Sequence, residues 1–478
     1  MKTSSLFLAS LCASALLSFN VNAQIGRRFP SEKKIVKDPV TGTMLTFLTS
    51  TPNGDSKIYQ THPQWTSDSQ WLIFRSGRAK NEAFAVNEQS GDIVQVTEGG
   101  YTGMLCVARK SMKLYYMHNV NPDAESTPLG TPGQAPAAPG STPPPRRQPT
   151  AVQIMVVDLA AVFADSKAGK MKPATAYQHL CGTIPAEMNP GNDMALDADE
   201  QVVYGRVGKT EAAKHIAANA KIEPAFGPRN MGAGPSGLIS MDVNTGAIKY
   251  ITSVPFQIGH IQVNPWVHGE IIFCWETGGK SPQRTWTVMA DGTGLRPLYP
   301  EASYEWVTHE AVITKDEVAI ALMGHRPVTK TVYTPATTGT EFKDVSNPVN
   351  PGQETGWGNS GTREKPTGLG IVNLRTQEMT IIGQTPSGSG LWHVNGSADG
   401  RWAVGDDFSR TVYLIDRHTR EMIPLSTGHK ATAADHPHPT FSADGTRIEI
   451  QSAMLSEDNK SMNICIIPVP ESWLKRTY

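Results

Sequence analysis

The sequence has no excess of charge of either sign. It contains 43 Lys and Arg residues against 44 Asp and Glu residues, for a formal net charge of −1. Proteins that bind nucleic acid usually carry a clustered basic excess, so this balance argues against a nucleic-acid partner. Beyond residue 23 no run is apolar and long enough to span a membrane, which takes about 20 residues.

Cysteine is scarce, and the signatures of several enzyme classes are missing. The chain has five cysteines and no CxxC pair. Four of them, Cys106, Cys181, Cys274 and Cys465, lie far apart and mostly within strand-like runs. This spacing favours buried free thiols over a disulfide framework, although an exported protein could form one disulfide. A GxSxG nucleophile elbow, a Walker A sequence and an EF-hand loop are also absent, so the chain lacks the motifs of those hydrolases and of those nucleotide- and calcium-binding proteins.

The first 23 residues have the pattern of a secretory signal peptide. Lys2 gives a positive start, Leu6 to Phe19 an apolar run, and Val21-Asn22-Ala23 a small-residue cleavage site. We predict cleavage after Ala23 and a mature protein that is periplasmic or secreted. The alternative for this segment is a buried N-terminal helix.

What the sequence does contain is a repeat. A short polar turn, often with Asp-Gly, precedes an apolar, β-rich run in seven places. These turns are at residues 66–69, 108–112, 197–200, 264–269, 314–317, 397–400 and 442–445. Most copies are followed by a second pair of short strands around another turn. Four short strands per unit at this spacing predict the blades of a β-propeller.

We therefore predict an all-β fold, a seven-bladed β-propeller over residues 24–478. The last copy is followed by too few residues for a complete blade, so we expect Met44–Leu48 to supply its outer strand and close the ring. Three segments interrupt the repeat: a Pro-rich surface insertion at 119–150, a connection at 207–236 with a possible short helix from Glu211 to Lys221, and a polar insertion at 328–366.

Histidines recur at matching positions of the repeat. Each of five precedes a turn–strand copy by a few residues: His62, His260, His309, His393 and His436. Matching positions in a propeller lie on one rim, so these side chains could converge although they are distant in sequence. A single histidine at such a position is more often a structural hydrogen-bonding residue, and that alternative stays open here.

Two further features point to anion and metal binding. His436 and His438 lie two residues apart between prolines, which stiffen an extended backbone and place both imidazoles on one side. Such a pair suits a divalent metal ion. The alternative is that His-Pro-His is only the edge of a strand and binds no metal. Arg284, at the start of a strand pair before His309, is either a solvated rim charge or a clamp for a carboxylate.

These motifs, in this order, resemble those of the oligogalacturonate lyases, polysaccharide lyase family 22. The resemblance covers most of the mature chain and rests on five motifs: Gly259-His260, Phe273-Cys274-Trp275-Glu276, Thr308-His309-Glu310, Val404-Gly405-Asp406 and His436-Pro437-His438-Pro439. It implies a metal-dependent lyase that cleaves short uronate oligosaccharides by β-elimination and leaves a 4,5-unsaturated uronate. It also implies an acidic oligosaccharide as substrate.

The resemblance assigns roles to individual residues. The metal, typically Mn²⁺ in this family, would be bound by His393, His436 and His438. The catalytic base would be His309, assisted by Arg284. His260, Glu276 and Glu310 lie in the shared motifs and are expected to contact substrate.

Two departures from the family pattern affect these expectations. The family's fourth metal ligand is a glutamine three residues before the first histidine of His-Pro-His, and here that position is Ala433. Either Asp435, His429 or a water molecule completes the metal shell instead, or the metal affinity is lower, or the ion is a different one. Trp275 stands where the family has histidine, so the uronate could differ as well. The alternative function is a non-catalytic exported propeller, similar to TolB-type repeats, that binds protein or glycan.

Overall fold

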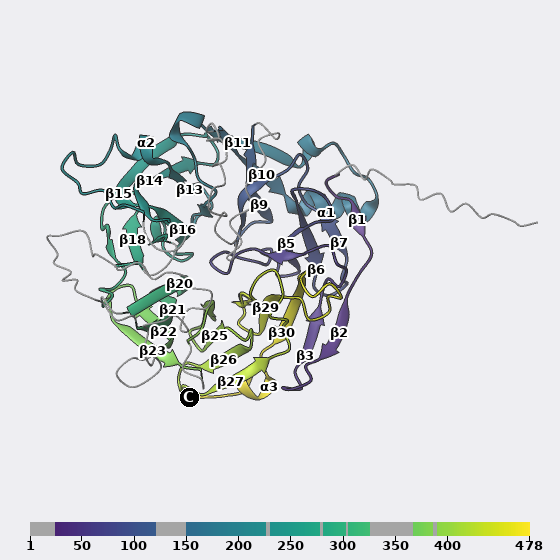
Figure 1. Ribbon diagram of the computed structural model, residues 1–478. Helices are drawn as coiled ribbons and strands as arrows, with labels where there is room; N and C mark the ends of the chain where they lie inside the picture. The colour runs from purple at the N-terminus through teal and green to yellow at the C-terminus, as the bar shows by residue number, and fades with distance from the viewer. Residues whose placement is uncertain are drawn as a thin grey trace, which may run out of the picture.

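The chain forms a seven-bladed β-propeller, as the repeat predicts (Figure 1). The computed structural model describes residues 24–120, 150–225, 230–277, 281–302, 305–325, 367–385 and 390–478. The predicted signal peptide lies outside these residues, as do most of the Pro-rich insertion and the polar insertion up to residue 366. No helix in the described ranges is long and apolar enough to cross a membrane.

The first four sheets follow one another along the chain. The first sheet contains β1 (Arg28–Phe29), β4 (Ser56–Lys57), β5 (Trp71–Ser76), β6 (Glu82–Asn87) and β7 (Ile93–Gln95). The second contains β8 (Thr102–Val107), β9 (Lys113–Asn119), β10 (Val152–Asp158) and β11 (Gln178–Ile184). The third contains β12 (Met194–Leu196), β13 (Val202–Val207), β14 (Ala233–Asp242) and β15 (Ile248–Phe256). The fourth contains β16 (Ile258–Val263), β17 (Glu270–Trp275), β18 (Thr285–Met289) and β19 (Arg296–Pro297).

The remaining three sheets complete the ring. The fifth contains β20 (Glu305–Thr314), β21 (Glu317–His325), β22 (Gly368–Asn373) and β23 (Met379–Gly383). The sixth contains β24 (Val394–Gly396), β25 (Trp402–Asp406), β26 (Val412–Asp416) and β27 (Met422–Ser426). The seventh contains β28 (Thr440–Phe441), β29 (Arg447–Ser452) and β30 (Asn463–Pro468), and adds β2 (Lys34–Lys37) and β3 (Met44–Phe47) from the N-terminus.

The repeated turn has a local physical cause. In blades 1, 6 and 7 an aspartate side chain accepts a hydrogen bond from the Ser or Thr hydroxyl two residues before it, at 2.6 Å in each case. The same carboxylate oxygen accepts a backbone N–H two residues after it, at 3.0 to 3.1 Å. Such side-chain-to-backbone bonds define a tight turn. The Ser/Thr-x-Asp pattern therefore marks the same hairpin in each of these blades.

The N-terminal segment closes the ring, as predicted. β3 pairs with β30 in antiparallel register, with Thr46 opposite Ile466 and Phe47 opposite Cys465. Asp38, just before this strand, accepts hydrogen bonds from Thr427 N at 2.6 Å and Thr427 Oγ1 at 3.1 Å at the end of β27. Burial raises the pKa of Asp38, but these and local backbone hydrogen bonds outweigh it and hold the pKa at about 2. The closure therefore joins the two blades that carry three of the candidate metal ligands.

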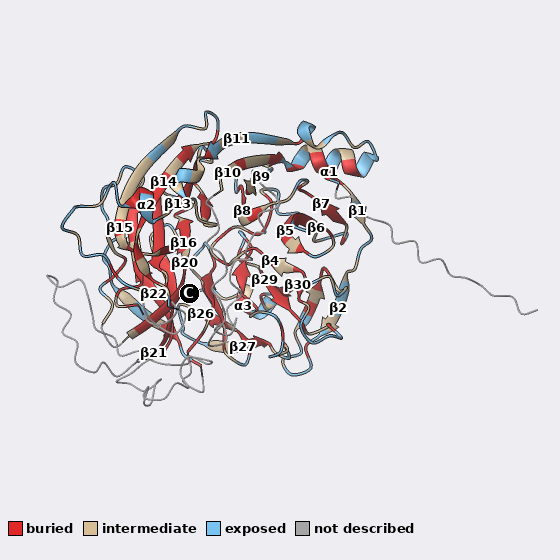
Figure 2. Cartoon of the chain, turned by 45° about the horizontal axis from the view of Figure 1, so that its top comes forward, coloured by how far each residue is buried: buried red, intermediate tan, exposed pale blue. Residues whose placement is uncertain are grey.

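Two helical segments differ from the prediction. α2 covers only Lys209–Ala212, not Glu211 to Lys221. After α2 the chain continues in tighter turns, in which the N–H groups of Lys214 and His215 donate to the carbonyls three residues earlier, at 3.0 and 3.1 Å. The sequence also did not predict α1 (Leu159–Ala168), which follows β10, is capped by Asp158 and packs Phe163 on Trp71 with ring centroids 4.1 Å apart. Figure 2 shows α1 buried on one side and exposed on the other.

A third short helix, α3 (Glu471–Leu474), and two 3₁₀ turns, Ala174–Ala176 and Ala186–Met188, complete the described elements. The four cysteines among the described residues are free thiols. Three are buried and Cys181 is partly exposed. The prediction of free thiols is therefore confirmed.

Candidate metal centre and active site

Four of the five rim histidines, together with His438, gather at one place in the ring. They come from β16 and β20, from the residue before β24, and from the segment before β28. Ring centroids are 6.1 Å apart for His260 and His309, and 4.5 Å for His309 and His393. His393 is 5.5 Å from His436 and 3.6 Å from His438. Side chains from four successive blades thus form a continuous cluster of imidazoles.

His62 does not share this environment. One ring nitrogen lies 2.8 Å from the Met194 carbonyl and the other 2.7 Å from Thr61 Oγ1. Burial lowers the pKa of His62 to about 4, so the ring is neutral. It lines a separate cavity of about 30 Å³ between the inner strands of blades 2 to 4, with room for about one water molecule. His62 is therefore a structural hydrogen-bonding residue, which was the alternative for a single histidine at this position of the repeat.

The backbone at three of the clustered histidines is unusual. His260, His309 and His438 have φ of 50°, 49° and 51°, in the left-handed region that non-glycine residues rarely adopt. The first two lie where the strand register shifts, between Gly259 and Gln262 and between Thr308 and Ala311. A bulge of this kind redirects a side chain out of the normal alternation. The bulges therefore explain why the side chains of His260 and His309 depart from the regular alternation of their strands.

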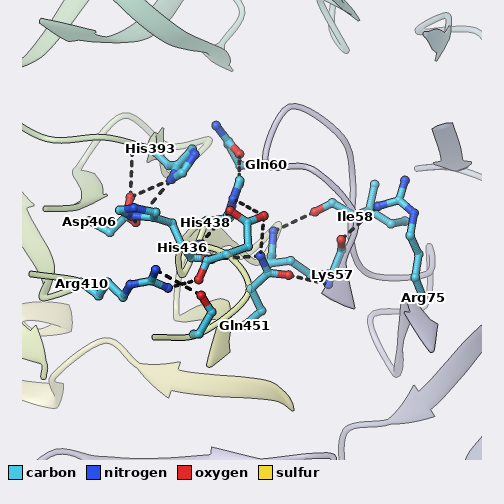
Figure 3. A network of polar contacts seen from close by, with 12 residues as sticks. Lys57, Ile58, Gln60, Arg75, His393, Asp406, Arg410, His436, His438 and Gln451 are labelled. Atoms are coloured by element: carbon cyan, nitrogen blue, oxygen red, sulfur yellow. Dashed lines mark hydrogen bonds and ion pairs between the residues drawn. The ribbon is translucent and has the colours of Figure 1, made fainter. Parts of the chain in front are cut away.

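Asp406 contacts two of the clustered histidines, His393 and His436 (Figure 3). Its carboxylate lies 3.2 and 3.3 Å from His393 Nδ1 and 3.1 Å from His436 Nδ1. It also accepts the backbone N–H of His393 at 2.8 Å. Burial raises the pKa of Asp406, but the two imidazoles outweigh it and lower the pKa. A carboxylate that accepts both Nδ1–H groups leaves both Nε2 lone pairs for a metal.

His438 completes the arrangement from the opposite side. Its Nδ1 lies 2.8 Å from Gln60 Oε1, so the amide oxygen accepts the ring N–H and again leaves Nε2 as the open nitrogen. Within the described ranges, the Nε2 atoms of His393 and His438 are buried and have no hydrogen-bond partner. His438 Nε2 is 3.0 Å from Asp435 Oδ2, but without hydrogen-bond geometry.

Unpartnered buried nitrogens are costly, because each loses its hydrogen bonds to water. These Nε2 atoms therefore fit a bound cation. A group of candidate ligand atoms within 4.8 Å of one another comes from His393, Asp406 and His436, so it includes the carboxylate and does not include His438. The residues that the resemblance assigns to a metal thus have the chemistry of a divalent-ion site with an ordered outer layer of hydrogen bonds.

The other half of the cluster surrounds His309. Its Nδ1 lies 2.9 Å from Thr308 Oγ1. Burial, followed by the neighbouring His393 and Arg284, lowers the pKa of His309 well below its usual value of 6.5. The imidazole is therefore unprotonated in neutral solution. In the tautomer whose Nδ1–H donates to Thr308, Nε2 carries the free lone pair that a general base needs.

Arg284 lies in a charge network. Its Nε is 3.1 Å from Glu310 Oε2, and its Nη2 is 3.7 Å from Glu276 Oε2 and 3.3 Å from His260 Nδ1. Burial raises the pKa of Glu310, but Arg284 and His260 outweigh it and hold the pKa at about 2. Two carboxylates, those of Glu276 and Glu310, already contact the guanidinium group of Arg284. Arg284 is therefore not a solvated surface charge, and its guanidinium group is not free to bind a substrate carboxylate.

The three residues expected to contact substrate differ in exposure. Glu310 has no exposed side chain, whereas His260 and Glu276 keep 23% and 19%. Only the latter two can therefore contact a ligand directly without rearrangement. Trp275, at the position that departs from the family pattern, is buried, donates its indole N–H to the Gly232 carbonyl at 3.0 Å and stacks on Phe256.

Sequence reasoning missed several residues of this site. Tyr59 lies edge-on to three imidazoles, with ring centroids 5.0 Å from His260, 5.2 Å from His438 and 6.3 Å from His393. Burial raises the pKa of Tyr59 well above its usual value, so the phenol stays protonated. Trp392 packs its ring 4.3 Å from His309. The Val404-Gly405-Asp406 motif was a signal for Asp406, but nothing in the sequence singled out Tyr59 or Gln60.

The fold and the site together define a seven-bladed propeller with a histidine-rich centre, and comparisons agree with that architecture. No family model and no curated protein matches the sequence. Among solved structures, an oligogalacturonate lyase in complex with manganese shares 17% identity and a TM-score of 0.65, over 95% of this chain and all of that one.

An oligogalacturonate lyase from Vibrio parahaemolyticus also shares 17% identity, with a TM-score of 0.64 over 94% of this chain and all of that one. The fold is thus that of the oligogalacturonate lyases. At 17% identity the comparison shows the fold, and the roles of individual residues stay predictions.

Proposed function

We propose that the protein is a metal-dependent lyase that cleaves short uronate oligosaccharides by β-elimination. The observation that carries this proposal is the joint location of an unprotonated, buried His309 and of three imidazoles whose Nε2 atoms can bind a cation. β-Elimination removes a weakly acidic C5 proton beside a carboxylate, so it needs both a base and positive charge at that carboxylate. Within one set of packed side chains, His309 would be the base, and a metal bound by the other histidines would supply the positive charge.

His393, His436 and His438 would bind the metal ion, for which Mn²⁺ is the first candidate. When bound, the ion supplies positive charge that stabilises the enolate-like charge on the uronate carboxylate. Asp406 and Gln60 hold the three imidazoles in the required tautomer, and this outer layer orients the donors before substrate arrives.

His309 would take the C5 proton through Nε2. Its neutral state is maintained by burial and by the nearby positive charge of Arg284. Because Arg284 already contacts Glu276 and Glu310, this electrostatic role suits it better than a direct clamp on the substrate. His260 and Glu276 remain partly exposed and would contact the sugar, while Glu310 positions Arg284 and His260.

Tyr59 would donate its phenol proton to the departing 4-oxygen, since the phenol is protonated and its ring lies against imidazoles of both halves of the cluster. Tyr59→Phe keeps the ring packing and removes only the hydroxyl, so we expect kcat to fall about 100-fold at unchanged metal content. Steady-state kinetics with metal analysis would measure this. A variant with wild-type kcat would mean that water donates the proton.

The direct test of the function is the ultraviolet absorbance of the 4,5-unsaturated product. Purified protein would be incubated with galacturonate oligomers, and in parallel with rhamnogalacturonan- and ulvan-derived oligomers, in the presence of Mn²⁺. We expect absorbance to rise with one class, to stop rising when EDTA removes the metal, and to resume after Mn²⁺ is restored. No product from any uronate oligomer with metal-loaded protein would favour the non-catalytic binding propeller.

The predicted signal peptide would place the activity outside the cytoplasm.

A further inference from the structure

Ala433 occupies the sequence position at which the lyase pattern has its fourth metal ligand, yet this residue does not belong to the histidine cluster. Its side chain is buried in a small apolar cluster with Ala453 and Met462. Its backbone N–H donates to the Lys430 carbonyl at 3.0 Å, so the residue is part of a turn. The local chain thus turns position 433 toward the blade interior.

Asp435, two residues later, contacts the cluster instead. Its Oδ2 lies 3.0 Å from His438 Nε2, which is one of the two buried imidazole nitrogens without a hydrogen-bond partner among the described residues. Its Oδ1 accepts the backbone N–H of His436 at 2.8 Å. One oxygen of the carboxylate, Oδ1, is thus held by a hydrogen bond within the turn. The other oxygen, Oδ2, faces His438 Nε2, the nitrogen that is expected to bind the metal.

Two neighbouring side chains hold Asp435 in this position. Gln451 Nε2 donates to Asp435 Oδ2 at 3.3 Å and to the His436 carbonyl at 2.9 Å. Arg410 donates to the carbonyls of Ala431, at 3.0 Å, and of Asp435. Because a buried arginine fixes the backbone of the turn, the carboxylate is oriented before any ion binds. Figure 3 shows Arg410 and Gln451 flanking this segment.

We propose that Asp435 is the fourth protein ligand of the metal, in place of the amide that the lyase pattern has at position 433. This inference rests on the proposed function. Three neutral imidazoles and one carboxylate leave a divalent ion with a net charge of about +1 rather than +2 at the site. A carboxylate also suits a hard ion such as Mn²⁺ better than a neutral amide does. The site therefore binds its metal more tightly than an all-neutral set would.

The other candidates for this role are engaged elsewhere. His429 has one ring nitrogen 3.0 Å from Ser426 Oγ and the other 2.8 Å from Ser452 Oγ. The Asp406 carboxylate lies against the Nδ1 atoms of two histidines, on the side away from their Nε2 atoms. Asp435 is thus the carboxylate next to an open Nε2.

The test is direct measurement of Mn²⁺ binding to the full-length mature protein by calorimetry, with the electron paramagnetic resonance spectrum of the bound ion as a second readout. We expect Asp435→Ala to weaken Mn²⁺ binding at least about 10-fold. Asp435→Asn keeps one side-chain oxygen, which can face either the turn or the metal, so its loss of Mn²⁺ affinity should be smaller than that of Asp435→Ala. The bound-ion spectrum should change in both variants.

Matched controls separate a ligand from a structural residue. Asp444→Asn makes the same substitution in an aspartate turn of the same blade and should bind Mn²⁺ as the wild type does. His429→Asn should also retain binding. Circular dichroism of the metal-free variants would verify that each is folded.

The outcomes distinguish this inference from the proposed function. If wild type and Asp435→Ala bind Mn²⁺ equally, with the same spectrum, Asp435 is not a ligand, while the proposed function stands. Loss of binding in His429→Asn but not in Asp435→Ala would assign the ligand to His429 and overturn the inference. A folded wild-type protein that binds no Mn²⁺ would overturn both.

Discussion

Replacement of His309 by glutamine is expected to lower kcat for uronate β-elimination by about 10²- to 10⁴-fold, the usual contribution of a positioned general base. Glutamine keeps much of the volume and a hydrogen bond to Thr308 but cannot accept a proton. Because His309 is not one of the proposed metal ligands, bound Mn²⁺ should stay at the wild-type level. The measurement is product absorbance together with metal content of the same samples.

His62→Gln is the matched control for this substitution. His62 also precedes a turn–strand copy and is buried, but both ring nitrogens have partners outside the histidine cluster. Its substitution should leave kcat near the wild-type value in the folded protein. If His309→Gln retained full activity, or lost metal together with activity, the assignment of His309 as the base would be wrong.

Asp406→Asn is expected to weaken Mn²⁺ binding about 10- to 100-fold, as is usual when an outer partner of ligating histidines is removed. The carboxylate of Asp406 accepts from the Nδ1 atoms of both His393 and His436. An amide has an NH₂ group in place of one carboxylate oxygen, so it cannot accept from the His393 backbone N–H and from both Nδ1–H groups as the carboxylate does, and one of the two imidazoles can then adopt the other tautomer. That ring then carries its proton on Nε2 and cannot bind the ion.

Calorimetry of Mn²⁺ binding would measure this effect, and activity should recover in part when Mn²⁺ is raised. Asp407→Asn is the adjacent control, because the Asp407 carboxylate contacts Ser409 and the Thr411 backbone instead of the histidines. Equal affinities for the Asp406 variant and the wild type would mean that Asp406 does not set the tautomers.

The backbone of the site explains part of its organisation. Non-glycine residues in the left-handed region cost about 1–3 kcal/mol each, and such strain persists where the surrounding structure determines it. His260, His309 and His438 all adopt this conformation. We infer that the strands around them, together with Asp406 and Gln60, hold the imidazoles in place before any ion or substrate binds.

Much of the fold could be predicted from local patterns. The Ser/Thr-x-Asp turns recur because one short side chain can satisfy the same backbone groups in each blade. The segment from Met44 pairs with β30 because the last copy lacks an outer strand, and the prediction of ring closure is confirmed. Helix α1 escaped prediction because it is inserted between two strands of one blade, where no repeat marks it.

The sequence by itself determined the type and number of the blades, and it named the histidines by their matching places in the repeat. Only the tertiary structure decided which of them meet: His62 is satisfied by hydrogen bonds elsewhere, while the other four gather with His438. It also brought in Tyr59 and Gln60, and it placed Asp435, one of the candidates from the sequence, beside His438, because the positions of all three depend on loop conformation. The physical reason is that strand and turn patterns arise from interactions a few residues apart, whereas the site forms only when distant blades close into a ring.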